Sequence, residues 1–278
     1  SPVAVDTGFI VYNQQNYPNF SHILSDLNVS TQPTSMSFSV KLIEPNLEYN
    51  GSSLKQLFGQ KKNLIKPNFY RMLWDILRFN RRAPGLLDST SYEITLGEYA
   101  IESGFSQDFI HHYLVPMGAA IWSSSPSAIL EMPACFFIRF FKNHGMLNVN
   151  DRPQWRTITG GSRQYVNKMI ASFAENIRLG HKVRSVERFY DRVTVDGDSY
   201  DHVVFSCHSD QAIEALSDPS VYETDILSKI SYQKNEVIMH TDTSIMPARE
   251  DLWAACGKNT GSIDRERRRS MRIKTVAG

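Results

Sequence analysis

One thiol and one imidazole stand side by side in this sequence, at Cys207 and His208, and few other neighbouring residues suggest chemistry. Both follow an apolar run at 201–206 that predicts a buried strand, and adjacent residues of a strand point to opposite faces. The other histidines, such as His144, lie apart from any thiol, and we expect them to be structural. The pattern therefore gives little support to a thiol enzyme.

Longer catalytic signatures are absent from the sequence. It has no serine-hydrolase elbow, no zinc-protease motif, no Walker loop and no GxGxxG dinucleotide turn. The three cysteines, Cys135, Cys207 and Cys256, form no CxxC pair, so neither a zinc site nor a disulfide framework is indicated. We therefore expect no bound metal and a reducing compartment, the cytoplasm.

The composition is that of a globular protein of 278 residues, with 41% hydrophobic and 21% charged residues. Thirty basic residues oppose 29 acidic ones, so no broad electrostatic field favours nucleic acid as a partner. From Gly257 onward, however, basic residues dominate without apolar periodicity. We interpret 254–278 as a non-native or disordered basic tail, and a nucleic-acid or membrane arm is the alternative.

The elements that must position any site are of both types, so the fold class is α/β, with mixed α and β. Apolar residues at helical spacing predict a helix over 18–27, and alternation around Pro45 predicts a hairpin over 36–49. Residues 52–143 are mostly helical in pattern, with caps expected at Ser53, Asn68, Thr95 and Ser106. A strand, a Gly160-Gly161-Ser162 turn and a helix are expected next, over 155–175. Further strands are predicted at 177–179, 183–188, 193–195, 201–206 and 237–240.

Several blocks of sequence carry a specific resemblance. They are Val5-Asp6-Thr7-Gly8-Phe9-Ile10-Val11-Tyr12-Asn13, Met36-Ser37-Phe38-Ser39-Val40, Glu48-Tyr49-Asn50-Gly51-Ser52-Ser53, Tyr113-Leu114-Val115-Pro116-Met117-Gly118-Ala119-Ala120-Ile121-Trp122-Ser123, Arg152-Pro153-Gln154-Trp155-Arg156-Thr157, Gly160-Gly161-Ser162-Arg163-Gln164-Tyr165-Val166 and Asp201-His202-Val203-Val204-Phe205-Ser206-Cys207-His208. In this order they resemble predicted NAD/FAD-binding proteins of the flavin-containing amine oxidase superfamily, over about residues 3 to 253.

The resemblance implies an incomplete FAD/NAD(P)-binding three-layer domain interleaved with a largely helical substrate domain. Residues 1–13 and 155–230 would form the partial FAD-binding domain, and 14–154 with 231–253 the substrate domain. Two departures matter, because the family's GxGxxG segment would lie before Ser1 and its flavin-binding C-terminal segment is missing after 253. We therefore expect a chain truncated at both ends and inactive by itself.

The resemblance also implies FAD as cofactor and suggests which residues contact it. Candidate cofactor-binding residues are Asp6, Thr7, Gly8, Phe9, Val183, Cys207 and His208. For each of them an ordinary turn, a core position or plain packing is the alternative. Gly160-Gly161-Ser162 invites a phosphate nest, but in this superfamily the loop is mainly structural.

Tyr113, Met117 and Trp122 are the candidate substrate-binding residues, although aromatic and Met side chains at helical spacing more often belong to a core. Trp122 is the best candidate for a substrate wall, since the small residues at 116–120 are not expected from plain helix packing.

The implied reaction is hydride transfer from a small or lipid-like substrate to flavin. A fatty-acyl substrate, with peripheral lipid or membrane contact, is suggested because similar domains occur beside or fused to cyclopropane fatty acid synthases. Amines are the other option. A non-catalytic binding protein with a degenerate flavoprotein fold remains the alternative function.

Overall fold

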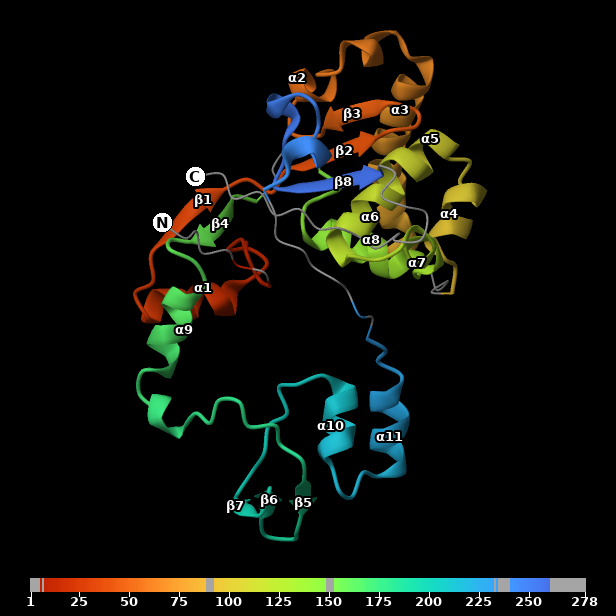
Figure 1. The fold of residues 1–278 in the computed structure, drawn as a ribbon. Helices are drawn as coiled ribbons and strands as arrows, with labels where there is room; N and C mark the ends of the chain where they lie inside the picture. The colour runs from red at the N-terminus through yellow and green to blue at the C-terminus, as the bar shows by residue number, and fades with distance from the viewer. Residues whose placement is uncertain are drawn as a thin grey trace. The chain divides into compact units, whose positions relative to one another are not determined.

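The computed structural model describes residues 6, 8–88, 93–148, 153–232, 234 and 241–260, with side chains described only as far as residue 256 in the last range. Two compact units are distinguished (Figure 1). The larger unit comprises Ser1–Met169 and Asn235–Gly278, and the smaller unit comprises Ile170–Lys234. The domain bounds expected from the sequence differ from these units and stay a prediction.

A three-stranded sheet, in the order β3-β2-β8, forms one layer of the larger unit (Figure 1). The strands are β2 (Phe38–Leu42), β3 (Leu47–Asn50) and β8 (Cys256–Thr260). β2 pairs antiparallel with β3, which confirms the predicted hairpin, and its turn contains a cis peptide bond before Pro45. β8 pairs parallel with β2 and lies where the sequence suggested the start of a tail.

Helices pack beside this sheet (Figure 1). Ser53, Thr95 and Ser106 accept hydrogen bonds from the backbone at the N-termini of their helices, as predicted. The predicted cap at Asn68 is wrong, because Pro67 occupies the first helical turn and Lys66 is the N-cap. The elements are α2 (Leu54–Leu57), η1 (Lys61–Ile65), α3 (Pro67–Arg82), η2 (Ala83–Asp88), α4 (Leu96–Glu102), α5 (Gln107–Phe109), the π-helix η3 (Ile110–Leu114), α6 (Val115–Trp122), α7 (Pro126–Glu131) and α8 (Ala134–Asn143).

One hydrophobic core joins the sheet to these helices. Val40 and Tyr49 from the strands are buried together with Phe79, Phe109 and Phe137 from the helices. Burial of such large apolar side chains is the main favourable contribution to folding, at roughly 1.5–3 kcal/mol each for aliphatic and Phe residues. This part of the chain therefore has a core of its own.

The N-terminal segment and the glycine turn belong to a second layer of the larger unit. β1 (Thr31–Thr34) pairs antiparallel with β4 (Trp155–Ile158), and helices α1 (Pro18–Asp26) and α9 (Arg163–Ile170) flank the pair (Figure 1). Tyr12, Leu24 and Ile158 form its small core. The helix predicted after the glycine turn is confirmed, but it ends at Ile170 rather than near residue 175.

The smaller unit holds the meander β5 (Val186–Arg188), β6 (Val193–Val195) and β7 (Asp198–Tyr200), followed by α10 (Ser209–Ala215) and α11 (Val221–Ser228). Its core consists of Val186, Val193, Ala215 and Leu216.

The buried strand predicted at 201–206 is wrong, since these residues form no strand and Val204 is 85% exposed. An apolar strand is buried only when partner strands and a covering layer are supplied, and no strand within the described part of the smaller unit pairs with 201–206. The strand predicted at 177–179 is also absent, with Leu179 89% exposed. The one predicted at 237–240 lies outside the described residues.

Candidate functional site

The predicted cofactor segment is anchored to the glycine turn before α9. The backbone N–H of Ser162 donates to both carboxylate oxygens of Asp6, at 3.1 and 2.9 Å, and its hydroxyl donates to the carbonyl oxygen of Phe9 at 3.2 Å. Gly160 and Gly161 have φ values of +81° and +86°, which side chains rarely tolerate. The fold thus brings together a turn and a segment whose contacting residues are 153 and 156 positions apart in sequence.

The Asp6–Ser162 contact bears on whether the glycine turn binds a phosphate or is structural. Positive-φ glycines before a helix make an anion-binding concavity, and the helix dipole adds to it. Here the amide of Ser162 already binds the carboxylate of Asp6. The contact favours the structural interpretation of Gly160-Gly161-Ser162 over a phosphate nest.

Beyond Phe9, the segment is held along β4. The hydroxyl of Thr157 donates to the carbonyl oxygen of Ile10 at 2.9 Å. Tyr12 and Arg156 exchange two backbone hydrogen bonds, of 3.0 and 2.8 Å. The backbone around Gly8 and Phe9 is therefore fixed on both sides, as a binding wall requires. Thr7 lies outside the described residues.

Space remains open beside this wall. Among the described residues, no atom lies within 4 Å of a Cβ placed on Gly8, and the ring of Phe9 is 42% exposed. Phe9 meets Tyr17 and Phe20 edge to face, with ring centroids 5.4 and 5.2 Å apart. A planar aromatic ligand beside Gly8 would have Phe9 as its neighbour.

A continuous row of aromatic side chains connects Phe9 with Trp122. From Phe9 the row passes to Tyr17 at 5.4 Å and to His144 at 6.5 Å between ring centroids. It continues to Phe140 at 3.9 Å and ends at Trp122, a further 4.8 Å away. Residues predicted from the sequence to face the cofactor and the substrate are therefore the two ends of one contact chain in the larger unit.

His144 is held at the centre of this row. Its Nδ1 lies 2.9 Å from the carbonyl oxygen of Phe140, which can only accept, so Nδ1 carries a hydrogen. In the neutral ring Nε2 is then the acceptor. The ring also lies nearly parallel to Trp155, at 8° with centroids 6.4 Å apart.

The residues predicted for the substrate lie close together on consecutive helical turns. Trp122 packs among Phe136, Phe137 and Phe140, with centroids 4.8–6.0 Å apart. Tyr113 stacks on Phe109 at 5.7 Å, and Met117, like Tyr113 and Trp122, is only partly buried. Their role with a substrate stays a prediction.

The expectation that the small residues at 116–120 mark a substrate wall beside Trp122 is wrong. The small residues at 116–120 do serve helix packing, because a Cβ on Gly118 would come within 2.8 Å of Ile129 and 3.1 Å of Phe137. Gly118 thus lets α6 approach α7 and α8 closely. The small residues give no independent sign of a substrate cavity.

The remaining predicted contacts lie in the smaller unit. Val183 is 37% exposed and outside any strand, so the core position considered for it is wrong. Cys207 is exposed, and His208 stacks on Tyr232 with centroids 3.9 Å apart at 6°. The Tyr232 hydroxyl accepts from the backbone N–H of Ser209 at 2.9 Å, which fixes the start of α10. The cofactor roles of these residues stay predictions.

These observations fit one part of a flavin dinucleotide better than another. An open glycine beside a half-exposed Phe suits a planar ring system. A pyrophosphate is less well served. The sequence has no GxGxxG turn to bind it, and the Ser162 amide at the positive-φ glycine turn already binds Asp6. Among the described residues, no group of three or more His, Cys, Asp or Glu could hold a metal ion. None of the described helices is both long and apolar enough to cross a bilayer.

Sequence reasoning missed Tyr17 and His144, which belong to the aromatic row, and Trp155, which lies parallel to His144. A signal was present for His144, which follows Phe140 by one helical turn in an aromatic-rich segment. No local signal links Tyr17 to His144, because that contact depends on the tertiary fold.

Comparisons with known proteins place this geometry in context. A family model described as flavin containing amine oxidoreductase matches residues 3–272. A mutant of putrescine oxidase with redesigned cofactor binding superposes with a TM-score of 0.58 and 12% identity, covering 81% of this chain and 52% of that one. Cyclohexylamine oxidase from Brevibacterium oxydans IH-35A superposes with a TM-score of 0.58 and 13% identity, and the coverage of the two chains is the same. A CLA-producing fatty acid isomerase from P. acnes superposes with a TM-score of 0.56 and 10% identity. The match again covers 81% of this chain and 52% of that one.

At these identities the structural likeness shows the fold alone. The chain spans about half the length of the solved structures it matches. The search of curated proteins found no match.

Proposed function

Since the chain belongs to the flavin-containing amine oxidoreductase family, we propose that it contributes to a FAD-dependent oxidoreductase that moves a hydride from a small or lipid-like substrate to flavin. The observation that carries this proposal is the aromatic row between the open Gly8–Phe9 wall and Trp122. When bound, the flavin would supply the redox chemistry by accepting the hydride, and dioxygen or another acceptor would reoxidise it.

The residues of this chain would bind and orient rather than react. Gly8 admits the ring without a Cβ in the way, and Phe9 packs beside it. Asp6 holds this wall in place through Ser162. Trp122, with Tyr113 and Met117, would contact the substrate, and the apolar aromatic row would keep water from the space between substrate and ring.

The first experiment removes the open space. A Cβ at Gly8 meets no described atom, so we expect the fold to tolerate Gly8→Leu, whereas flavin affinity should fall by about tenfold or more. Gly51→Leu is the matched control, because a Cβ there also meets no atom and Gly51 lies outside the proposed wall. The measurement is quenching of flavin fluorescence on titration with protein. Equal affinities for the wild type and Gly8→Leu would remove the wall from the proposal.

The second experiment tests the whole function. The native protein is purified from its source cells, and its visible absorbance is recorded before and after anaerobic addition of putrescine, cyclohexylamine or linoleic acid. We expect flavin bands that one of these substrates bleaches, and restoration by air. A colourless, folded native protein would contradict the proposal.

A non-catalytic binding protein with a degenerate flavoprotein fold is the second candidate. The Asp6–Ser162 contact favours it, since that contact uses an amide that a phosphate would need. The two candidates differ in whether flavin binds. The flavoenzyme predicts that riboflavin or FAD binds and that Gly8→Leu weakens the binding by about tenfold or more, whereas the non-catalytic protein predicts that neither flavin binds.

A further inference from the structure

A pocket on the larger unit is unused by the proposed function. Its cavity measures about 600 Å³, within the usual range for small-molecule sites. It lies between the β2–β3 turn, η1, the start of α3 and the π-helix η3 with α5. The lining residues are Pro45, Leu47, Lys62, Ile65, Lys66, Pro67, Asn68, Phe69, Met72, Asp108 and His112, none of them predicted for the cofactor or substrate.

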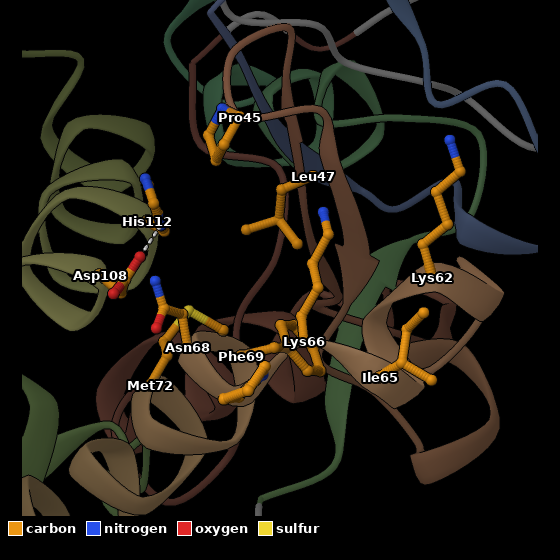
Figure 2. A pocket seen from close by; sticks show the side chains of 11 residues that line it. Pro45, Leu47, Lys62, Ile65, Lys66, Asn68, Phe69, Met72, Asp108 and His112 are labelled. Carbon is orange, nitrogen blue, oxygen red and sulfur yellow. Dashed lines mark ion pairs between the residues drawn. The ribbon is translucent and has the colours of Figure 1, made fainter.

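The floor of the pocket is apolar. Leu47, Phe69 and Met72 are at most 4% exposed and anchored in the main core, so this floor is rigid. Ile65, by contrast, is 83% exposed at the rim, where an aliphatic side chain gains nothing from water. Figure 2 shows Leu47, Phe69 and Met72 between Ile65 on one side and His112 on the other. Such walls suit a hydrocarbon chain.

Positive charge gathers at the same pocket without a matching acid. Lys62 and Lys66 both line it (Figure 2). The ammonium of Lys66 donates only to a neutral group among the bonds described, the carbonyl oxygen of Asn46, at 3.1 Å. The N-terminus of α3, at Pro67, adds the positive end of a 16-residue helix that has neither a side-chain cap nor an acidic residue in its first turn. The two lysines of the lining and the start of α3 each favour an anion at this pocket.

The one acidic residue of the lining is already paired. Asp108 lies 3.3 Å from Nδ1 of His112, on the opposite side of the pocket from Lys62 (Figure 2). Burial lowers the pKa of His112, the Asp108 carboxylate opposes that shift, and the positive charges of His111 and Lys66 lower it further. Two lysines against one carboxylate leave the lining with an excess of positive charge.

We propose that this pocket binds a long-chain carboxylate, with the hydrocarbon chain on the floor of Leu47, Phe69 and Met72 and the carboxylate toward Lys62 and Lys66. A hydrophilic phosphate would make no use of the apolar walls, and a neutral lipid would leave the ammonium groups without a counter-charge. A single-chain anionic amphiphile satisfies both. The binding needs no flavin, so its success or failure is independent of the proposed oxidoreductase function.

The test is calorimetric titration of the 278-residue chain with monomeric dodecanoate. We expect one molecule per chain, with affinity falling about fourfold for each methylene removed in decanoate and octanoate. Dodecyltrimethylammonium, which has the same chain with the opposite charge, should bind at least about tenfold more weakly. Equal binding of the two amphiphiles would overturn the proposal, as would saturation only by phosphatidylglycerol vesicles.

Two sets of variants locate the site. The double variant Lys62→Gln with Lys66→Gln should weaken dodecanoate about tenfold, while Lys61→Gln, a neighbouring lysine on η1 outside the lining, should change it less than about twofold. Asn68→Trp should fill the pocket from the exposed start of α3 and abolish binding, and Asn68→Ala should not. Unchanged affinity in the double variant and in Asn68→Trp would place any binding elsewhere and overturn the proposal.

Discussion

The two units of this chain differ in how much apolar surface each can bury by itself. The larger unit has a contiguous core that includes the fully buried side chains of Tyr49, Phe79, Phe109 and Phe137. Among the described residues of the smaller unit, the core consists of Val186, Val193, Ala215 and Leu216. Its exposed apolar residues include Leu179, Tyr190, Val204, Val221 and Tyr222, each more than 80% exposed.

The difference in buried apolar surface indicates which unit can be stable by itself. The larger unit buries a large apolar core of its own, although side chains such as Ile65 and Ile101 stay exposed. The smaller unit does not, because segments with the pattern of buried strands remain uncovered. We expect its stability to be low and its structure to open locally before the larger unit unfolds.

The largest expected effect comes from the core of the larger unit. Phe137 is fully buried and stacks on Phe141 at 4.2 Å, so Phe137→Ala should lower the free energy of unfolding by about 3–5 kcal/mol. Leu216→Ala, the matched truncation in the smaller unit, should cost about 2 kcal/mol, because a thin, half-open core leaves little cavity.

The chain offers a clean way to separate these effects. All four tryptophans, Trp74, Trp122, Trp155 and Trp253, belong to the larger unit. Urea unfolding followed by tryptophan fluorescence should therefore respond to Phe137→Ala and hardly to Leu216→Ala. Hydrogen exchange should show the reverse in peptides from 170–234. Equal shifts of the fluorescence transition in both variants would break the comparison.

What the sequence predicted correctly is local. The β2–β3 hairpin and the caps at Ser53, Thr95 and Ser106 depend on a few neighbouring residues, and all are present. The failed strand at 201–206 depends on partners elsewhere, which an apolar run cannot specify. For the candidate site, the Asp6–Ser162 contact and the aromatic row join residues more than 100 positions apart, which single-sequence patterns cannot reveal.

A smaller effect is expected on the pH dependence of stability, where two helix capping boxes that are alike in sequence should differ. Glu98 in the larger unit and Glu223 in the smaller one each bind the N-cap residue of their helix, Thr95 and Ser220. The hydrogen bonds from Thr95 lower the pKa of Glu98. Glu223 also accepts two bonds from Arg188, at 2.6 and 3.1 Å, and these, with Ser220, lower its pKa to about 2.

Because both pKa values are lower in the folded chain, these contacts stabilise it above the ordinary carboxyl pKa of 4.5. This stabilisation is lost as the pH falls below 4.5. For Glu223 the loss extends down to about pH 2, a wider pH range than for Glu98. Carboxyl titration by NMR should give Glu223 the lower pKa of the two. Glu223→Gln should flatten the acid response of hydrogen exchange in 170–234, and Glu98→Gln should not. Identical titration of the two carboxyls would show that Arg188 adds nothing.

The smallest expected effect is the sharpest test of the uncovered strand segment. Val204 is 85% exposed, so Val204→Thr, which replaces a methyl by a hydroxyl of similar size, should change the free energy of unfolding by less than about 0.5 kcal/mol. Val40→Thr in β2 is the matched control, because Val40 is fully buried and its new hydroxyl would cost about 1–3 kcal/mol if unpaired. The measurement is urea unfolding followed by circular dichroism. A cost at Val204 as large as at Val40 would mean that something covers 201–206 in solution, and the contrast between the two units would then reflect a missing partner rather than an unstable fold.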